Sequence, residues 1–184
     1  LRYDDLGSFP PPPIPLEMSR FSRGLVFLDT PESYYLCNAA FTGNTVTIRS
    51  YLAKDNIAEL INLPDINGMT ALMFSVTTNE PRNRAEVTQA LAEHRDIDLN
   101  VITSRGFTAL MLAVQAGRFE IVKILLDNGA KLDIQQSDGN TAIMHAATKG
   151  AIDIATLLVE SGADINLMTL DGSTALTYAA FHGK

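Results

Sequence analysis

The side chains that most often carry chemistry in proteins are scarce in this chain. It has three histidines, His94, His145 and His182, and one cysteine, Cys37. A metal site needs such ligands close together, which usually leaves short, recognisable spacings in the sequence. No pair of these residues has metal-ligand spacing, and the sequence holds no nucleophile-elbow, P-loop or His-Glu-x-x-His motif. The sequence therefore predicts that these residues form no enzyme active site and bind no metal or cofactor.

Other reactive side chains have structural interpretations. Aspartates recur at matched positions along the chain: Asp133, Asp138, Asp164 and Asp171. Because these positions coincide with expected turns, we interpret the carboxylates as turn residues rather than as a catalytic pair. We interpret Cys37 as a small buried core residue rather than a reactive thiol. His145 is expected on the exposed side of its helix, as a surface or binding residue.

A repeat of 33 residues organises the chain. Gly106, Gly139 and Gly172 are 33 residues apart, and a threonine follows two positions after each. Each threonine opens a similar run, "TALMLAVQAG", "TAIMHAATKG" or "TALTYAAFHG". An earlier copy is "INLPDINGMTALMFSV" (61–76), and a fainter one is "YYLCNAAFTGNTVTIRSYL" (34–52). Self-similarity at such a period is typical of an array of stacked units.

Each unit is predicted to be a turn followed by two helices. An Asn-Gly or Asp-Gly pair favours a tight turn, and the threonine that follows is a good N-cap for the first helix. Glycines at 43, 117, 150 and 183 suit the left-handed position that ends this helix. The second helix carries apolar residues at helical spacing, such as Ile121, Val122 and Leu125. No unit can bury its apolar faces alone, so the units must stack.

The repeats resemble the ankyrin-repeat family. The family pattern D-G-x-T-P-L-H-x-A, G-x-x-E-I-V-x-x-L-L and G-A-D-V-N is similar to "DGNTAIMHAATKGAIDIATLLVESGADIN" (138–166). The resemblance covers about residues 33–184 and implies an all-α solenoid of helix-turn-helix units with projecting turn fingers. We assign the units to 33–66, 67–104, 105–137, 138–170 and 171–184. The last is truncated at Lys184, from which we expect the protein to continue, as a monomer or as part of a longer chain.

The repeats also depart from the family pattern. The family proline after the threonine is Ala71, Ala109, Ala142 or Ala175, and the family histidine is Met73, Met111, Met144 or Thr177. We therefore expect apolar packing to replace an inter-repeat polar contact. The second unit is longer, with 38 residues from Gly68 to Gly106, and most of the excess lies at 78–84. This insertion is either a tolerated surface loop or a loop that contacts a partner.

The resemblance implies that a protein partner binds the fingers and the concave face lined by the first helices. The matching positions lie after each turn glycine and five residues into each run that opens with threonine. They are Met69, Phe74, Phe107, Leu112, Asn140, His145, Ser173 and Tyr178. Alternatively, Phe74 and Leu112 are partly buried between repeats, which would interrupt this stripe. The resemblance also implies that the finger asparagines Asn62, Asn100 and Asn166 can be hydroxylated.

Composition limits the classes of partner. The formal net charge is −7, and the 14 basic residues are scattered, so nucleic acid is not expected. No apolar run is long enough to predict insertion into a membrane. A single cysteine favours an intracellular location, which we take to be cytoplasmic.

Residues 1–32 differ from the repeats. The tract Phe9, Pro10, Pro11, Pro12 and Pro13 is predicted to be extended polyproline II. It is either a linker or tail, or a ligand similar to the F-P-P-P-P core bound by EVH1 domains. Residues 21–32 are expected to cover the open end of the first repeat.

These observations predict a protein-binding module without enzyme activity of its own. Two alternatives stay open. The repeats could present substrate to a catalytic domain elsewhere in a larger enzyme or effector, or the array could be a structural spacer.

Overall fold

The computed structural model describes residues 31–77 and 83–183. The proline tract, residues 21–30 of the expected cap and residues 78–82 of the insertion lie outside these ranges. Within them the chain forms helices and no strand, which confirms the predicted all-α class. The helices are α2 (Pro31–Thr42), α3 (Thr45–Leu52), α4 (Ile57–Leu60), α5 (Ala71–Thr77), α6 (Arg84–Ala92), α7 (Ala109–Gln115), α8 (Phe119–Asp127), α9 (Ala142–Lys149), α10 (Ile152–Glu160) and α11 (Ala175–Phe181).

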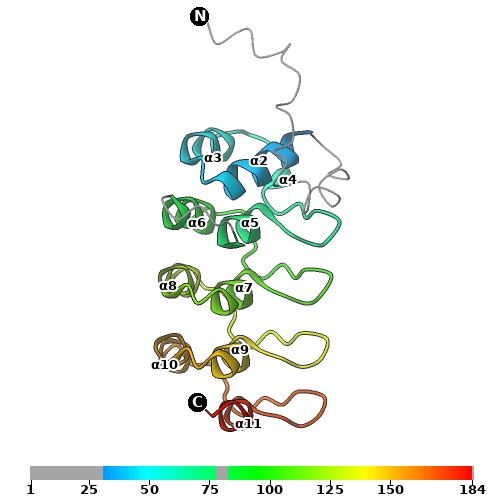
Figure 1. Cartoon of the computed structure of the whole chain (residues 1–184). Coiled ribbons are helices and arrows are strands. Elements are labelled where there is room, and N and C mark those ends of the chain that lie inside the picture. The colour runs from blue at the N-terminus through cyan, green and yellow to red at the C-terminus, as the bar shows by residue number, and fades with distance from the viewer. Residues whose placement is uncertain (1–30, 78–82, 184) are drawn as a thin grey trace, which may run out of the picture.

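The helices stack in two rows. The first helices of the units, α2, α5, α7, α9 and α11, form one row, and α3, α6, α8 and α10 form a second row beside it (Figure 1). The loops that precede α5, α7, α9 and α11 project away from both rows as fingers. The first unit adds α4, a single helical turn that the sequence did not predict.

Small and apolar side chains fill the space between the rows. Met73, Met111 and Met144 are each 1% exposed, so apolar packing does occupy the position where the family pattern has histidine. Cys37, at the matching position of α2, is also buried, and burial together with the nearby Asp65 raises the pKa of its thiol to about 12. The thiol is therefore protonated and enclosed, which confirms its interpretation as a core residue.

Threonine caps begin most of the first helices. The hydroxyl oxygens of Thr70, Thr108 and Thr174 accept hydrogen bonds from the backbone N–H groups three residues later, at 3.4, 3.2 and 3.4 Å. Thr141 also stands at the N-cap of its helix, but its hydroxyl makes no capping hydrogen bond. The predicted caps are therefore confirmed at three positions, and the predicted bond is wrong at Thr141.

Successive fingers lie against one another. The backbone N–H of Ser104 donates to the carbonyl of Asn67 at 2.8 Å, and that of Leu170 donates to Asp138 at 2.9 Å. Gly68 has a φ of +80°, and a Cβ atom there would lie 2.6 Å from the Cα atom of Thr103. This glycine is therefore required both by its backbone conformation and by the close approach of the next finger.

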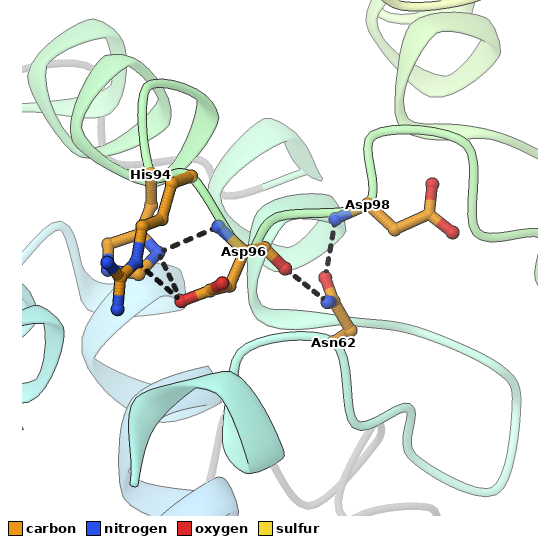
Figure 2. Close-up of polar contacts among 5 residues, drawn as sticks. Asn62, His94, Asp96 and Asp98 are labelled. Atoms are coloured by element: carbon orange, nitrogen blue, oxygen red, sulfur yellow. Dashed lines mark hydrogen bonds and ion pairs between the residues drawn. The ribbon is translucent and has the colours of Figure 1, made fainter. Parts of the chain in front are cut away.

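Side-chain bonds join the bases of the fingers. The Asn62 amide accepts from the backbone N–H of Asp98 and donates to the carbonyl of Asp96, each at 2.7 Å (Figure 2). Asn100 accepts in the same way from the backbone N–H of Lys131 at 2.9 Å. Two of the three asparagines proposed for hydroxylation thus have their side-chain oxygens engaged in links between repeats.

The recurring aspartates divide into two groups. Asp138, Asp164 and Asp171 accept from the backbone N–H two residues later, at 3.0, 2.9 and 3.2 Å, as their interpretation as turn residues predicts. Asp133 instead accepts from the backbone N–H of Asp164 in the next unit, at 3.0 Å. Asp133 stands at the base of a finger and links it to the next unit, as Asn62 and Asn100 do in earlier units. Its interpretation as a turn residue is therefore wrong.

Candidate functional site

A groove of about 480 Å³ lies on the finger side of the second and third units. Helices α2, α5 and α7 and the fingers at 65–69 and 103–107 contribute its walls. The residues that line it are Phe41, Asp65, Asn67, Met69, Phe74, Thr77, Thr103, Ser104, Arg105, Phe107, Leu112 and Gln115. The walls thus combine five large apolar side chains with a polar rim, an arrangement typical of binding sites.

Four of the predicted contact residues meet in this groove. Met69, Phe107 and Leu112 are half-buried, whereas Phe74 is only 5% exposed. The ring of Phe41 in α2 lies edge-on to that of Phe74, with centroids 6.3 Å apart. Phe74 therefore supplies the floor of the groove rather than an exposed contact, as the alternative interpretation anticipated.

His145 supports the groove from the next unit. Its imidazole stacks on the Phe107 ring, with centroids 5.7 Å apart and an interplanar angle of 21°. Its Nδ1 atom lies 3.3 Å from Nε2 of Gln115, and its Nε2 atom lies 2.7 Å from Oε1 of Gln136. The prediction that His145 lies on the exposed side of its helix is wrong, because these neighbours leave it half-buried.

The two glutamines define the protonation state of His145. The Gln136 amide nitrogen donates to the carbonyl of Arg105 at 3.3 Å, which leaves its oxygen to face the imidazole. A neutral ring with its proton on Nε2 donates to Gln136 and accepts from Gln115, which satisfies both contacts. Burial lowers the pKa of His145, although the negative charge of Asp138 opposes the shift. The neutral form is therefore the one that fits.

The other predicted contact residues lie outside the groove. Asn140 donates through its backbone N–H and its amide to Asp138, at 3.0 and 2.8 Å, so it completes a finger turn. The backbone N–H of Ser173 donates to the Thr169 hydroxyl at 3.1 Å in the last finger. Tyr178 is half-buried on α11. The predicted contact residues that line the groove therefore come from the second and third units.

Several lining residues are not among those predicted from the sequence. Thr77 and Gln115 lie three residues after the predicted contact residues Phe74 and Leu112. Phe41 lies three residues after Asn38, which holds the matching position in the first unit. Residues three apart share a helix face, so these residues could have been predicted to lie beside the contact positions. Arg105 was missed as well, although it stands immediately before a turn glycine where other units have Asn67, Asp138 or Asp171.

A model of the family described as ankyrin repeats (3 copies) matches residues 36–136 and 128–184. The chain belongs to the ankyrin-repeat family. Ankyrin repeats are generally protein-binding modules. Comparison with curated proteins gave no match.

Within residues 31–77 and 83–183, no group of three or more histidine, cysteine, aspartate or glutamate side chains is placed to hold a metal ion. No helix in the same part of the chain has the length and apolar character needed to cross a membrane.

Proposed function

We propose that this ankyrin array is a protein-binding module that receives a segment of its partner in the groove between the fingers of the second and third units, at 65–69 and 103–107, which we call the second and third fingers. The observation that carries the proposal is that Met69, Phe74, Phe107 and Leu112 come from two units and line one cavity of about 480 Å³. Such a cavity accepts a large side chain, and burial of apolar area is the main source of affinity at such sites.

The walls of the groove are held in place before any partner arrives. Phe74 packs edge-on against Phe41, and the imidazole of His145 stacks on Phe107. The finger that carries Phe107 is joined to the preceding finger by the bond between Ser104 and Asn67. A preorganised surface loses little conformational entropy on binding, which favours affinity.

Selection from a phage-displayed library of random linear peptides tests this proposal. Peptides that bind are expected to lose at least about tenfold in affinity when Met69 and Leu112 are both changed to glutamine. Glutamine keeps the helix propensity of α7, and circular dichroism checks that the fold is retained. Ile152→Gln is the matched control, because Ile152 is an exposed apolar residue of α10 outside the groove.

Two results would contradict the proposal. Equal affinity of a selected peptide for the groove variant and the control would place binding elsewhere on the chain. Failure of any peptide to bind the folded chain would favour the structural spacer.

A further inference from the structure

Arg105 interrupts the pattern of the finger tips. The matching positions hold Asn67, Asp138 and Asp171, and the two aspartates bond the backbone N–H two residues later. In the third finger that backbone N–H belongs to Phe107, and it donates to the Thr103 hydroxyl instead, at 3.0 Å. The turn therefore forms without any contribution from the side chain of residue 105, so turn chemistry does not explain an arginine there.

The guanidinium of Arg105 is held at the edge of the groove. Its Cζ atom lies 5.6 Å from the centroid of the Phe107 ring, within the range of a cation–π interaction. Among the described residues, the ion pairs involve other cations, and no carboxylate is within 4.0 Å of Arg105. A guanidinium over an aromatic face keeps its N–H groups available for a carboxylate in its own plane.

The acidic residue in the groove does not neutralise this charge. The Asp65 carboxylate is buried and accepts from the backbone N–H groups of Asn67 and Met69, at 2.9 and 2.7 Å. It also accepts from the Asn67 amide at 3.3 Å. Its oxygens are committed to the second finger, so the charge that the described lining residues present to a ligand is the positive charge of Arg105.

We propose that the groove selects an acidic peptide segment, which places one large apolar side chain against Phe74, Phe107 and Leu112 and a neighbouring aspartate or glutamate on Arg105. This inference rests on the proposed function and adds the chemistry of the partner. The apolar side chain supplies buried area, and the carboxylate forms charge-assisted hydrogen bonds with the guanidinium.

The net charge of −7 does not oppose such a ligand at contact distance. Exposed charges farther away than the Debye length, about 8 Å at physiological ionic strength, are largely screened. The pair between Arg105 and the ligand forms at contact distance, well within the Debye length, so salt screens it less than it screens those distant charges. One or two acidic residues in the segment are enough, because Arg105 is the cation among the described residues that line the groove.

The first test uses the peptides selected from the random library. We expect enrichment of an aspartate or glutamate next to an aromatic or large aliphatic residue. Changing that acid to its amide should weaken binding by about tenfold, the effect of losing a charge-assisted hydrogen bond. Arg105→Gln should weaken the acidic peptide equally and should not weaken the amide peptide further. Lys131→Gln is the matched control, because it removes the same charge from another exposed position.

Reversing the charge of residue 105 tests whether Arg105 itself contacts the acidic side chain of the peptide. Arg105→Glu should reject the acidic peptide and bind a version in which lysine replaces the acid, restoring at least part of the lost affinity. Binding of the wild-type chain should also weaken as salt concentration rises, and Arg105→Gln should reduce that dependence.

The outcomes separate the two proposals. Peptides that lose affinity for the Met69 and Leu112 variant, yet show no acidic preference and no response to Arg105→Gln, would overturn the acidic class and leave the groove standing. Peptides that respond to neither set of changes would overturn both proposals. An equal loss with Lys131→Gln would show a general effect of net charge and would also overturn the role of Arg105.

Discussion

His145 cannot gain a proton without losing a contact. In the neutral form its Nδ1 atom accepts from the Gln115 amide and its Nε2 atom donates to Gln136. A proton on Nδ1 would face the N–H group of Gln115, and the charged ring would remain in a half-buried site. Asp138 favours the charged form, but burial outweighs this attraction and lowers the pKa of His145.

We expect His145 to make the stability of the folded chain depend on pH. Its pKa in the folded chain is below the ordinary value of 6.5, so the unfolded chain binds a proton that the folded chain does not. The free energy of unfolding should therefore be constant above about 6.5 and fall as pH drops from there towards the lowered pKa. Urea unfolding at neutral and mildly acidic pH measures this slope, and His145→Gln should flatten it.

A control variant and a second pH range isolate the effect. His182→Gln should retain the wild-type slope, because it leaves His145 and both glutamines in place. Hydrogen bonds also lower the pKa values of Asp138 and Asp171 below the ordinary value of 3.8. The stability that these two carboxylates contribute is fully present above pH 3.8 and is lost only as the pH falls below it, so it does not overlap with the range of His145. A slope that persists in His145→Gln would show that the dependence comes from another group.

Helices α5, α7, α9 and α11 each begin directly after a threonine, but the hydroxyls of Thr108 and Thr141 differ in their hydrogen bonds. The Thr108 hydroxyl accepts from the backbone N–H of Met111 at 3.2 Å, so it satisfies one of the free donors of the first turn. The Thr141 hydroxyl is buried and finds no hydrogen-bond partner among the described residues. The same residue type therefore stabilises α7 and leaves an unsatisfied polar atom beside α9.

Substitution by valine distinguishes the two threonines. Both N-caps have extended backbone, with φ and ψ of −90° and 167° at Thr108 and −113° and 172° at Thr141, which valine adopts readily. Thr108→Val should lower the free energy of unfolding by about 1 kcal/mol. Thr141→Val should leave it unchanged or raise it by up to about 1 kcal/mol, since an unsatisfied hydroxyl is removed. Equal losses in urea unfolding would show that Thr141 caps its helix in solution.

Local signals explain which elements could be predicted. The repeating threonine and glycine positions mark the beginning and end of α7, α9 and α11, because caps depend on neighbouring residues alone. The burial of Phe74 could not be predicted in the same way, because Leu112 holds the matching position and is only half-buried. The difference comes from Phe41 of the preceding unit, which packs on Phe74. Likewise α4 is a single turn whose N-cap residue, Asn56, makes no side-chain cap bond, so it carries no local signal.

The whole molecule is an array in which each unit contacts its neighbours. The stability of such an array is approximately the sum of unit and interface contributions. Helices α7 and α8 are covered by units on both sides, whereas α11 packs against α9 and has Leu176 and Phe181 that are 77% and 85% exposed. A hollow of about 560 Å³ beside α11 is lined by apolar residues of α9 and α10, including Ile143, Ala155 and Val159. The described part of this chain therefore buries less apolar area in its last unit than in its centre.

Hydrogen exchange should reveal this gradient. Amides of α11 open with the cost of one interface, so peptides covering 175–181 should exchange at least about tenfold faster than those covering 109–127. Leu125→Ala, a change in the buried face of α8, should speed exchange in α7 and α8 and also in the units beside them, by removing a core side chain worth about 2–5 kcal/mol. Ala175→Gly should speed exchange in α11 and leave 109–127 unchanged. Equal exchange across both regions, or loss of protection at 109–127 in Ala175→Gly, would instead mean that the units unfold together, and opening at the last unit would then disturb the groove between the second and third fingers.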